Sequence, residues 1–145
     1  MSHLRHFLTV EVFMQHNKSF WLWLAMAASF FAVGLPFWFI PYHQINLPSA
    51  LLHPGLFVVA AAALLVYAFN IASFWRSTLM VTLSVVVSEL ARVIVDVAID
   101  STTHNLLPFE IIITFMVGFP CALAGAAGGW CLAQIFPALR SRHSA

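Results

Sequence analysis

A row of polar and charged side chains runs along one predicted helix in the middle of the chain. Between residues 76 and 100, an otherwise apolar stretch contains acidic, basic and hydroxyl side chains. At about 100° per residue they share an arc of roughly 80° on one helical face, and the opposite face is Leu, Val and Ile. We call this row the polar stripe, and its members are Thr78, Thr82, Glu89, Arg92, Asp96, Asp100 and Thr103.

The spacing within the polar stripe favours contact between its charges. Glu89 lies three positions before Arg92, and Asp96 lies four positions after it. Both spacings bring side chains together on a helix, so we predict that Arg92 lies between the two carboxylates. When all three groups are ionised, one negative charge is in surplus. The surplus carboxylate can hold a proton or meet a cation, and this is the chemistry that the pattern predicts.

The composition predicts that this helix lies in a lipid bilayer. Hydrophobic residues make up 62% of the 145 residues, charged residues make up 8%, and the mean hydropathy is +0.94. A chain this poor in charge cannot cover a water-facing surface, and long apolar runs favour membrane-spanning helices. A charge near the centre of such a helix costs about 2.5–3.5 kcal/mol. We therefore expect the polar stripe to face other helices or water.

Four apolar runs predict an all-α membrane protein, built as an antiparallel bundle of four transmembrane helices. The expected spans are residues 19–40, 56–75, 77–100 and 108–136. The connection at Arg76 is so short that the second and third spans must be antiparallel neighbours. Residues 1–18 form an N-terminal segment with apolar side chains at helical spacing, where a short interfacial helix and a frayed tail are equally open interpretations. Residues 137–145 are a C-terminal tail.

Basic residues outside the spans predict the orientation. Lys and Arg occur in the N-terminal segment, at Arg76 and in the C-terminal tail, whereas the connections 41–55 and 101–107 contain neither. The positive-inside rule then places both termini and the Arg76 connection in the cytoplasm. We expect a multi-pass protein of the plasma membrane, which is the inner membrane of a bacterium.

The last predicted helix has a face suited to close packing. Small residues recur at every fourth position from Cys121, and Gly125 and Gly129 form a GxxxG pair. Such faces let two helix backbones approach closely. We expect this face to receive the polar stripe, with Cys121 at the depth of Glu89.

Polar residues on the neighbouring helices are candidates for completing the site. Thr114 and Glu110 share a face of the last helix and are expected at the depths of the two aspartates of the polar stripe. Tyr67 and Asn70 are three positions apart on the second helix. We expect these two side chains to close the site from the other side.

A second candidate site lies at the outer end of the third helix. Asp100 and His104 are four positions apart, and Glu110 follows across a short connection. Carboxylates and imidazoles are ligands for Zn, Mn or Fe. No fixed metal-binding motif accompanies these residues, and the same residue types also serve simply to end a helix and shape a turn. The metal site and the structural turn both remain open.

Several function classes find no support in the sequence. All seven histidines lie in predicted loops or tails rather than within spans, so no haem is expected, and we expect no nucleotide cofactor. The net charge of +1 with no basic stripe gives no basis for a nucleic-acid partner. No nucleophile motif such as GxSxG is present, so we name no catalytic residue and favour a non-enzymatic role.

The polar stripe and the outer end of the third helix give three functional hypotheses. The first is movement of protons or a small solute along the polar stripe, with Glu89 and Asp96 as binding groups and Arg92 as counter-charge. The second is an accessory or assembly subunit, whose polar stripe pairs with a larger membrane partner. The third is a metal-binding protein or metalloenzyme of the outer face. In the bilayer we expect a homo-oligomer or a larger complex, and a purely structural ion-pair network is an equally open interpretation of the charges.

Overall fold

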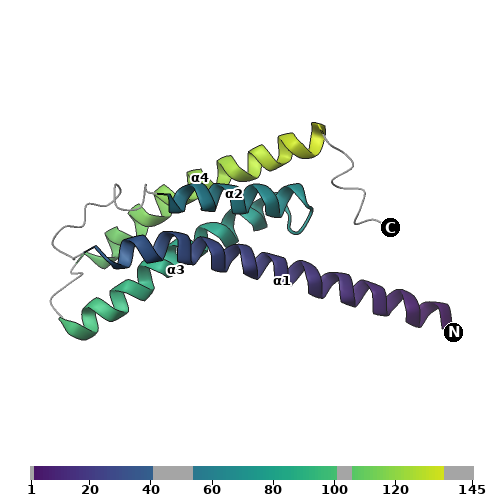
Figure 1. The fold of residues 1–145 in the computed structure, drawn as a ribbon, viewed down its shortest axis with the longest axis horizontal. Coiled ribbons are helices and arrows are strands. Elements are labelled where there is room, and N and C mark those ends of the chain that lie inside the picture. The colour runs from purple at the N-terminus through teal and green to yellow at the C-terminus, as the bar shows by residue number, and fades with distance from the viewer. Residues whose placement is uncertain (1, 41–53, 101–105, 136–145) are drawn as a thin grey trace.

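The computed structural model of the chain is built from helices. It describes residues 2–40, 54–100 and 106–135, with side chains from residue 17 onward. These residues form α1 (Ser2–Trp38), α2 (Gly55–Ala68), α3 (Phe74–Ile99) and α4 (Leu107–Ile135), and no strand occurs among them. Each helix runs opposite to the one before it, so the antiparallel arrangement is confirmed (Figure 1).

Three of the helices are long and apolar enough to cross a membrane. They are residues 17–38 of α1, all of α3 and all of α4, with 22, 26 and 29 residues. α2 is apolar but has 14 residues. At 1.5 Å per residue it is about 21 Å long, whereas a bilayer has a hydrocarbon core of about 30 Å. The chain thus has the helix lengths of an α-helical membrane protein, with one short member.

The outer surface of the bundle is apolar on all four helices. Trp23, Phe57, Ile94 and Met116 are 66%, 77%, 70% and 67% exposed. Apolar surface this extensive is unfavourable in water, but it is the surface that a bilayer requires. The side chains facing outward therefore agree with the lengths and composition of the helices.

α1 is one continuous helix. It begins at Ser2 and reaches Trp38 without a break at Lys18. The structure shows neither a separate interfacial helix nor a frayed tail over residues 2–18, because helical backbone continues directly into the apolar segment. Figure 1 shows the N-terminal part of α1 projecting beyond the ends of the other helices.

α2 ends earlier than its apolar run. We expected a span to residue 75, but the helix ends at Ala68, and Asn70 follows with a φ of 54°. The Asn70 N–H donates to the Tyr67 carbonyl at 2.9 Å, and the Ile71 N–H donates to the Val66 carbonyl at 3.0 Å. These bonds form a Schellman motif, which ends a helix with a left-handed residue. The connection to α3 is therefore residues 69–73, not the expected link at Arg76.

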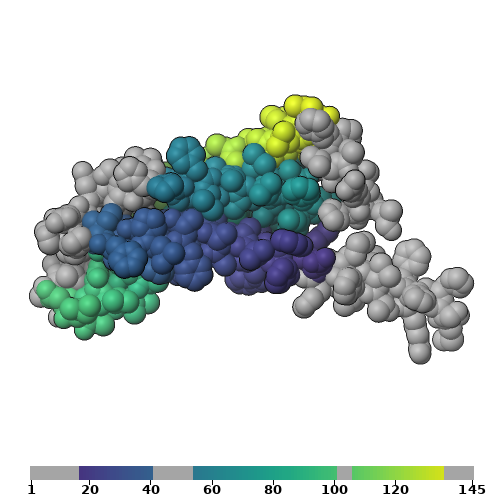
Figure 2. All heavy atoms as spheres, viewed as in Figure 1, coloured from purple at the N-terminus to yellow at the C-terminus, as the bar shows by residue number. Residues whose placement is uncertain are grey.

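α2 and α3 lie at the centre of the packing. α1 and α4 each pack against both of these helices, and α1 and α2 run side by side along one face (Figure 2). The side chains of the main core come from all four helices and are mostly Val and Ala. Its fully or nearly fully buried members are Val33, Phe37, Leu56, Val59, Ala62, Ala63, Val81, Val85, Ala122 and Ala126.

Candidate functional site

The polar stripe lies inside the bundle for most of its length. Thr78 and Thr82 are 0% exposed, Glu89 is 2% exposed and Arg92 is 6% exposed. Asp96 is half-buried and Asp100, directly after α3, is exposed. The expectation that the stripe faces other helices is confirmed for its buried members, and Thr103 lies outside the described residues.

Arg92 holds the C-terminal end of α1. Its Nη1 donates to the carbonyl oxygen of Phe37, and its Nη2 donates to the carbonyl oxygen of Ile40. The last carbonyls of a helix have no partner within the helix, and a positive charge is favourable at that end. The guanidinium carbon also lies 4.5 Å from the centroid of the Phe37 ring, within cation–π range. Arg92 therefore caps α1 from the neighbouring helix.

Asp96 completes this arrangement. Arg92 Nε donates to Asp96 Oδ2 at 3.0 Å, and the two side chains are 5% and 21% exposed. The predicted contact at a spacing of four is confirmed. The predicted contact of Arg92 with Glu89 stays a prediction. The structure adds two partners that were not predicted, because the terminal nitrogens of the guanidinium donate to backbone carbonyls at the end of α1. We call Arg92, Asp96 and the carbonyls of Phe37 and Ile40 the α1 latch.

Glu89 lies where α1 and α3 pack closely. A Cβ built on Gly34 would lie 2.7 Å from Ser88 Oγ, so the absence of a side chain at Gly34 brings the helices together. Trp38 Nε1 donates to the Ser88 carbonyl at 3.1 Å. Glu89 Oε2 is shielded from solvent at this level. Glu89 is thus buried at a level of α3 where α1 approaches closely.

The level of Thr114 can be deduced from the contact between Gly118 and Val85. A Cβ on Gly118 would lie 3.3 Å from Val85 Cβ, so these residues are at one height on α4 and α3. Because the helices are antiparallel, one turn from this contact places Thr114 level with Glu89. We expected Thr114 at the depth of Asp96, which is wrong by about two helical turns.

Two hydroxyl groups accompany Glu89 in the buried region. Ser88 and Thr114 are both 0% exposed. Neither Ser88 Oγ nor Thr114 Oγ1 has a hydrogen-bond partner within the described residues. Buried hydroxyls are normally hydrogen-bonded, so two hydroxyls without a partner at the level of a buried carboxylate are unusual for a purely structural core. We call Ser88, Glu89 and Thr114 the central polar group.

The small-residue face of α4 packs on α2 rather than on the polar stripe. A Cβ on Gly125 would overlap the backbone of Ala60, and a Cβ on Gly129 would lie 2.5 Å from the Leu64 carbonyl oxygen. The predicted close approach is confirmed, but its predicted partner is wrong. Cys121 lies about two turns along α4 from Thr114, and therefore away from the depth of Glu89 where it was expected.

Tyr67 and Asn70 do not close the site. Tyr67 lies edge-on to Phe74, the first residue of α3, with ring centroids 5.8 Å apart. Glu89 is fifteen positions further along α3, which corresponds to about 22 Å. Asn70 is exposed and supplies the left-handed backbone conformation that ends α2. Both residues are structural parts of the far end of the bundle.

The second candidate site is described only in part. Asp100 is exposed at the end of α3, and Glu110 is half-buried in the first turn of α4, where a negative charge is favourable. His104 lies outside the described residues. Among the residues that are described, no three His, Cys, Asp or Glu side chains form a group that could hold a metal ion.

Two features of this region were not predicted from the sequence. The carbonyls of Phe37 and Ile40 take two donors of Arg92, and Gly34 sets the distance between α1 and α3. The sequence did contain a signal for these contacts. Gly34, Pro36 and Pro41 mark the end of the first helix, and that end could have been placed level with Arg92. Comparison with protein-family models, curated proteins and solved structures finds no match to this chain.

Proposed function

We propose that this chain is a small membrane protein that moves protons or a small polar solute through its interior, with Glu89 as the central binding group. The observation that carries the proposal is the position of Glu89, which is 2% exposed near the middle of a helix long enough to cross a membrane. Ionisable residues inside membrane spans are costly, and they commonly mark ion or proton pathways.

The α1 latch supports a division of roles within the polar stripe. Arg92 donates to a carbonyl in the last turn of α1, to the Ile40 carbonyl just after that helix, and to Asp96, so this part of the stripe stabilises the helix arrangement. Our proposal therefore differs from the simplest hypothesis, in which Asp96 and Glu89 are equal binding groups. In this proposal Glu89 binds and releases the proton or solute, whereas Arg92 and Asp96 fix the position of α1 against α3.

The central polar group offers suitable hydrogen-bonding chemistry. A hydroxyl both donates and accepts, so Ser88 and Thr114 can exchange partners as a proton or solute passes. Their hydroxyls have no other partner in the described part of the chain. They are thus available to a transient ligand beside Glu89.

The other residues of the polar stripe support a path for the proton or solute from Glu89 toward both ends of α3. The hydroxyls of Thr78 and Thr82 continue the buried polar line from Glu89 toward the Arg76 end of α3. On the other side, Asp96 is half-buried and Asp100 is exposed, so polarity increases toward the end of the helix. We propose that the solute takes this line and enters the cytoplasm at the end that carries Arg76.

An accessory-subunit function is less well supported. That hypothesis requires the polar stripe to face the helix of a partner. Here Thr78, Thr82 and Glu89 are covered by the chain itself, so a partner helix cannot reach them without opening the bundle.

Proton flux into liposomes tests the proposal. The purified protein would be reconstituted with a pH-sensitive dye inside the vesicles and a potassium diffusion potential as driving force. We expect Glu89→Gln to abolish the flux, while Cys131→Ser, at an exposed position of α4 outside the polar stripe, retains it. Solutes would then be screened by their ability to compete with proton flux. Wild-type flux in a folded Glu89→Gln variant would contradict the proposal.

A further inference from the structure

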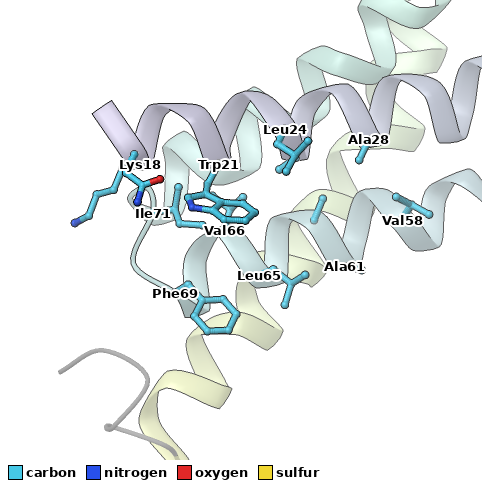
Figure 3. Close-up of a pocket in the computed structure, with 13 residues that line it drawn as sticks. Lys18, Trp21, Leu24, Ala28, Val58, Ala61, Leu65, Val66, Phe69 and Ile71 are labelled. Atoms are coloured by element: carbon cyan, nitrogen blue, oxygen red, sulfur yellow. The ribbon is translucent and has the colours of Figure 1, made fainter. Parts of the chain in front are cut away.

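A groove between α1 and α2 opens on the outside of the bundle. It has a volume of about 610 Å³, within the range of small-molecule sites (Figure 3). It contains no residue of the polar stripe, so a ligand bound in it would not depend on the proposed function. The lining residues are Asn17, Lys18, Trp21, Leu24, Ala25, Ala28, Val58, Ala61, Ala62, Leu65, Val66, Phe69 and Ile71.

The groove is polar at one end only. Lys18 is its single charged residue, and beyond Asn17 and Lys18 the lining is apolar. Figure 3 shows the Lys18 side chain extending past the end of the groove, while the Trp21 indole lies between α1 and α2. Lysine side chains near membrane surfaces extend in this way toward the headgroups, and tryptophan favours the same level. The Lys18 end therefore has the character of a membrane interface.

The length of the groove matches one leaflet. From Lys18 to Ala28 the groove runs along ten positions of α1, or about 15 Å, which is half of a hydrocarbon core of about 30 Å. Beyond this point α2 closes on α1, because a Cβ on Gly55 would lie 2.6 Å from the Ala32 carbonyl oxygen. A membrane-spanning helix of a second copy would need a longer furrow, whereas an acyl chain of one leaflet ends at this depth.

We propose that the groove binds one acyl chain of an anionic phospholipid, with the lipid phosphate beside the Lys18 ammonium group. The apolar lining accepts the chain, and the alanines at positions 25, 28, 61 and 62 provide the space for it. Charge complementarity at the mouth selects an anionic headgroup, since a lysine near a membrane surface attracts anionic lipid. The headgroup stays at the interface, level with Trp21.

Fluorescence quenching in lipid nanodiscs tests this proposal. The probes are phosphatidylglycerol and phosphatidylcholine, each with bromine atoms on an acyl chain, because bromine quenches a nearby tryptophan. We expect half-maximal quenching at an about fivefold lower fraction of phosphatidylglycerol than of phosphatidylcholine. Trp21→Phe should remove this selective component. Trp23→Phe should retain it, because Trp23 is 66% exposed and does not line the groove.

Matched substitutions separate the groove from general charge effects. Lys18→Gln should abolish the preference for phosphatidylglycerol, while Arg76→Gln, at an exposed residue outside the groove, should keep it. Ala28→Leu should fill the groove and reduce selective quenching. Ala27→Leu places the same side chain at an exposed neighbouring position that does not line the groove, and should have no such effect.

Two results would overturn the proposal. One is equal quenching by the two brominated lipids in the wild-type protein. The other is a dimer in nanodiscs that dissociates upon Ala28→Leu without any lipid preference, which would assign the groove to a second copy of the chain. Ala28 is exposed, so the substitution changes the groove without crowding the core.

Discussion

The Arg92 guanidinium on α3 lies against both the ring and the backbone of Phe37 on α1. Its Cζ is 4.5 Å from the ring centroid, and its Nη1 donates to the Phe37 carbonyl. Phe37 is 1% exposed, so this contact lies in the core. One side chain therefore contributes a cation–π contact, a helix cap and an ion pair to the same junction.

Removal of the Arg92 charge should destabilise the bundle. We expect Arg92→Gln to lower the free energy of unfolding by about 3 kcal/mol, because two hydrogen bonds from a charged donor to backbone carbonyls and the ion pair with Asp96 are lost. Arg92→Lys should be intermediate, since an ammonium lacks the planar fork. Unfolding by SDS in mixed micelles provides the measurement. Arg76→Gln, at an exposed position of α3, is the control, and an equal effect of both would refute the latch.

The contact between α2 and α4 should not tolerate a methyl group at Gly125. Gly125→Ala places a Cβ in the backbone of Ala60, and we expect a loss of about 1–3 kcal/mol of stability from overpacking. Gly128→Ala is the matched control, because its Cβ would lie 3.4 Å from the flexible end of Leu64. That variant should be neutral or slightly stabilising, since alanine favours helix. Thermal unfolding in detergent compares the two, and the prediction fails if their midpoints shift equally.

The residue at position 70 must adopt a left-handed conformation. Its φ of 54° costs an ordinary side chain about 1–2 kcal/mol, a penalty that glycine does not incur. Asn70→Ala should therefore lower the melting temperature, and Asn70→Gly should preserve it. The two variants control for each other because both remove the side-chain amide of Asn70. If both variants lose equal stability, the side-chain amide of Asn70, and not its backbone conformation, stabilises this end of α2.

The Thr114 hydroxyl should serve function rather than stability. Thr114→Val keeps the shape of the side chain and removes a buried hydroxyl with no partner among the described residues. We expect unchanged or higher stability, by about 1 kcal/mol, together with reduced proton flux. Thr82→Val is the comparison, since the Thr82 hydroxyl donates to the Thr78 carbonyl at 2.8 Å. If Thr114→Val lost as much stability as Thr82→Val, the Thr114 hydroxyl would have a stabilising hydrogen bond and the prediction would be wrong.

Features that depend on periodicity were predictable from the sequence. The helical wheel identified the face of α3 that is buried at Thr78, Glu89 and Arg92, and the spacing of four identified the ion pair of Arg92 with Asp96. Both result from fixed helix geometry within one element. The close approach at Gly125 was also predictable, because the small-residue pattern exists without knowledge of the fold.

Relations between elements were less accessible. A small-residue face indicates that some helix approaches closely, but α2 and α3 were both available to Gly125, and the sequence did not decide between them. The end of α2 was missed because apolar side chains continue past Ala68, and only the conformation of Asn70 ends the helix. The two backbone partners of Arg92 were missed because carbonyl groups occur at every residue and have no residue-type signal.

The contact of Gly125 and Gly129 with α2 has a consequence for synthesis. Chains are made from the N-terminus, so α4 is the last of these helices to leave the ribosome. Until then α2, with 14 residues, lacks its contact with the glycines of α4, against which its backbone packs. A ribosome-bound chain truncated before residue 107 would therefore contain α2 without its final neighbour. The contacts of α2 with α4 can form only after α4 has been translated, so the described helices reach their native arrangement at that step.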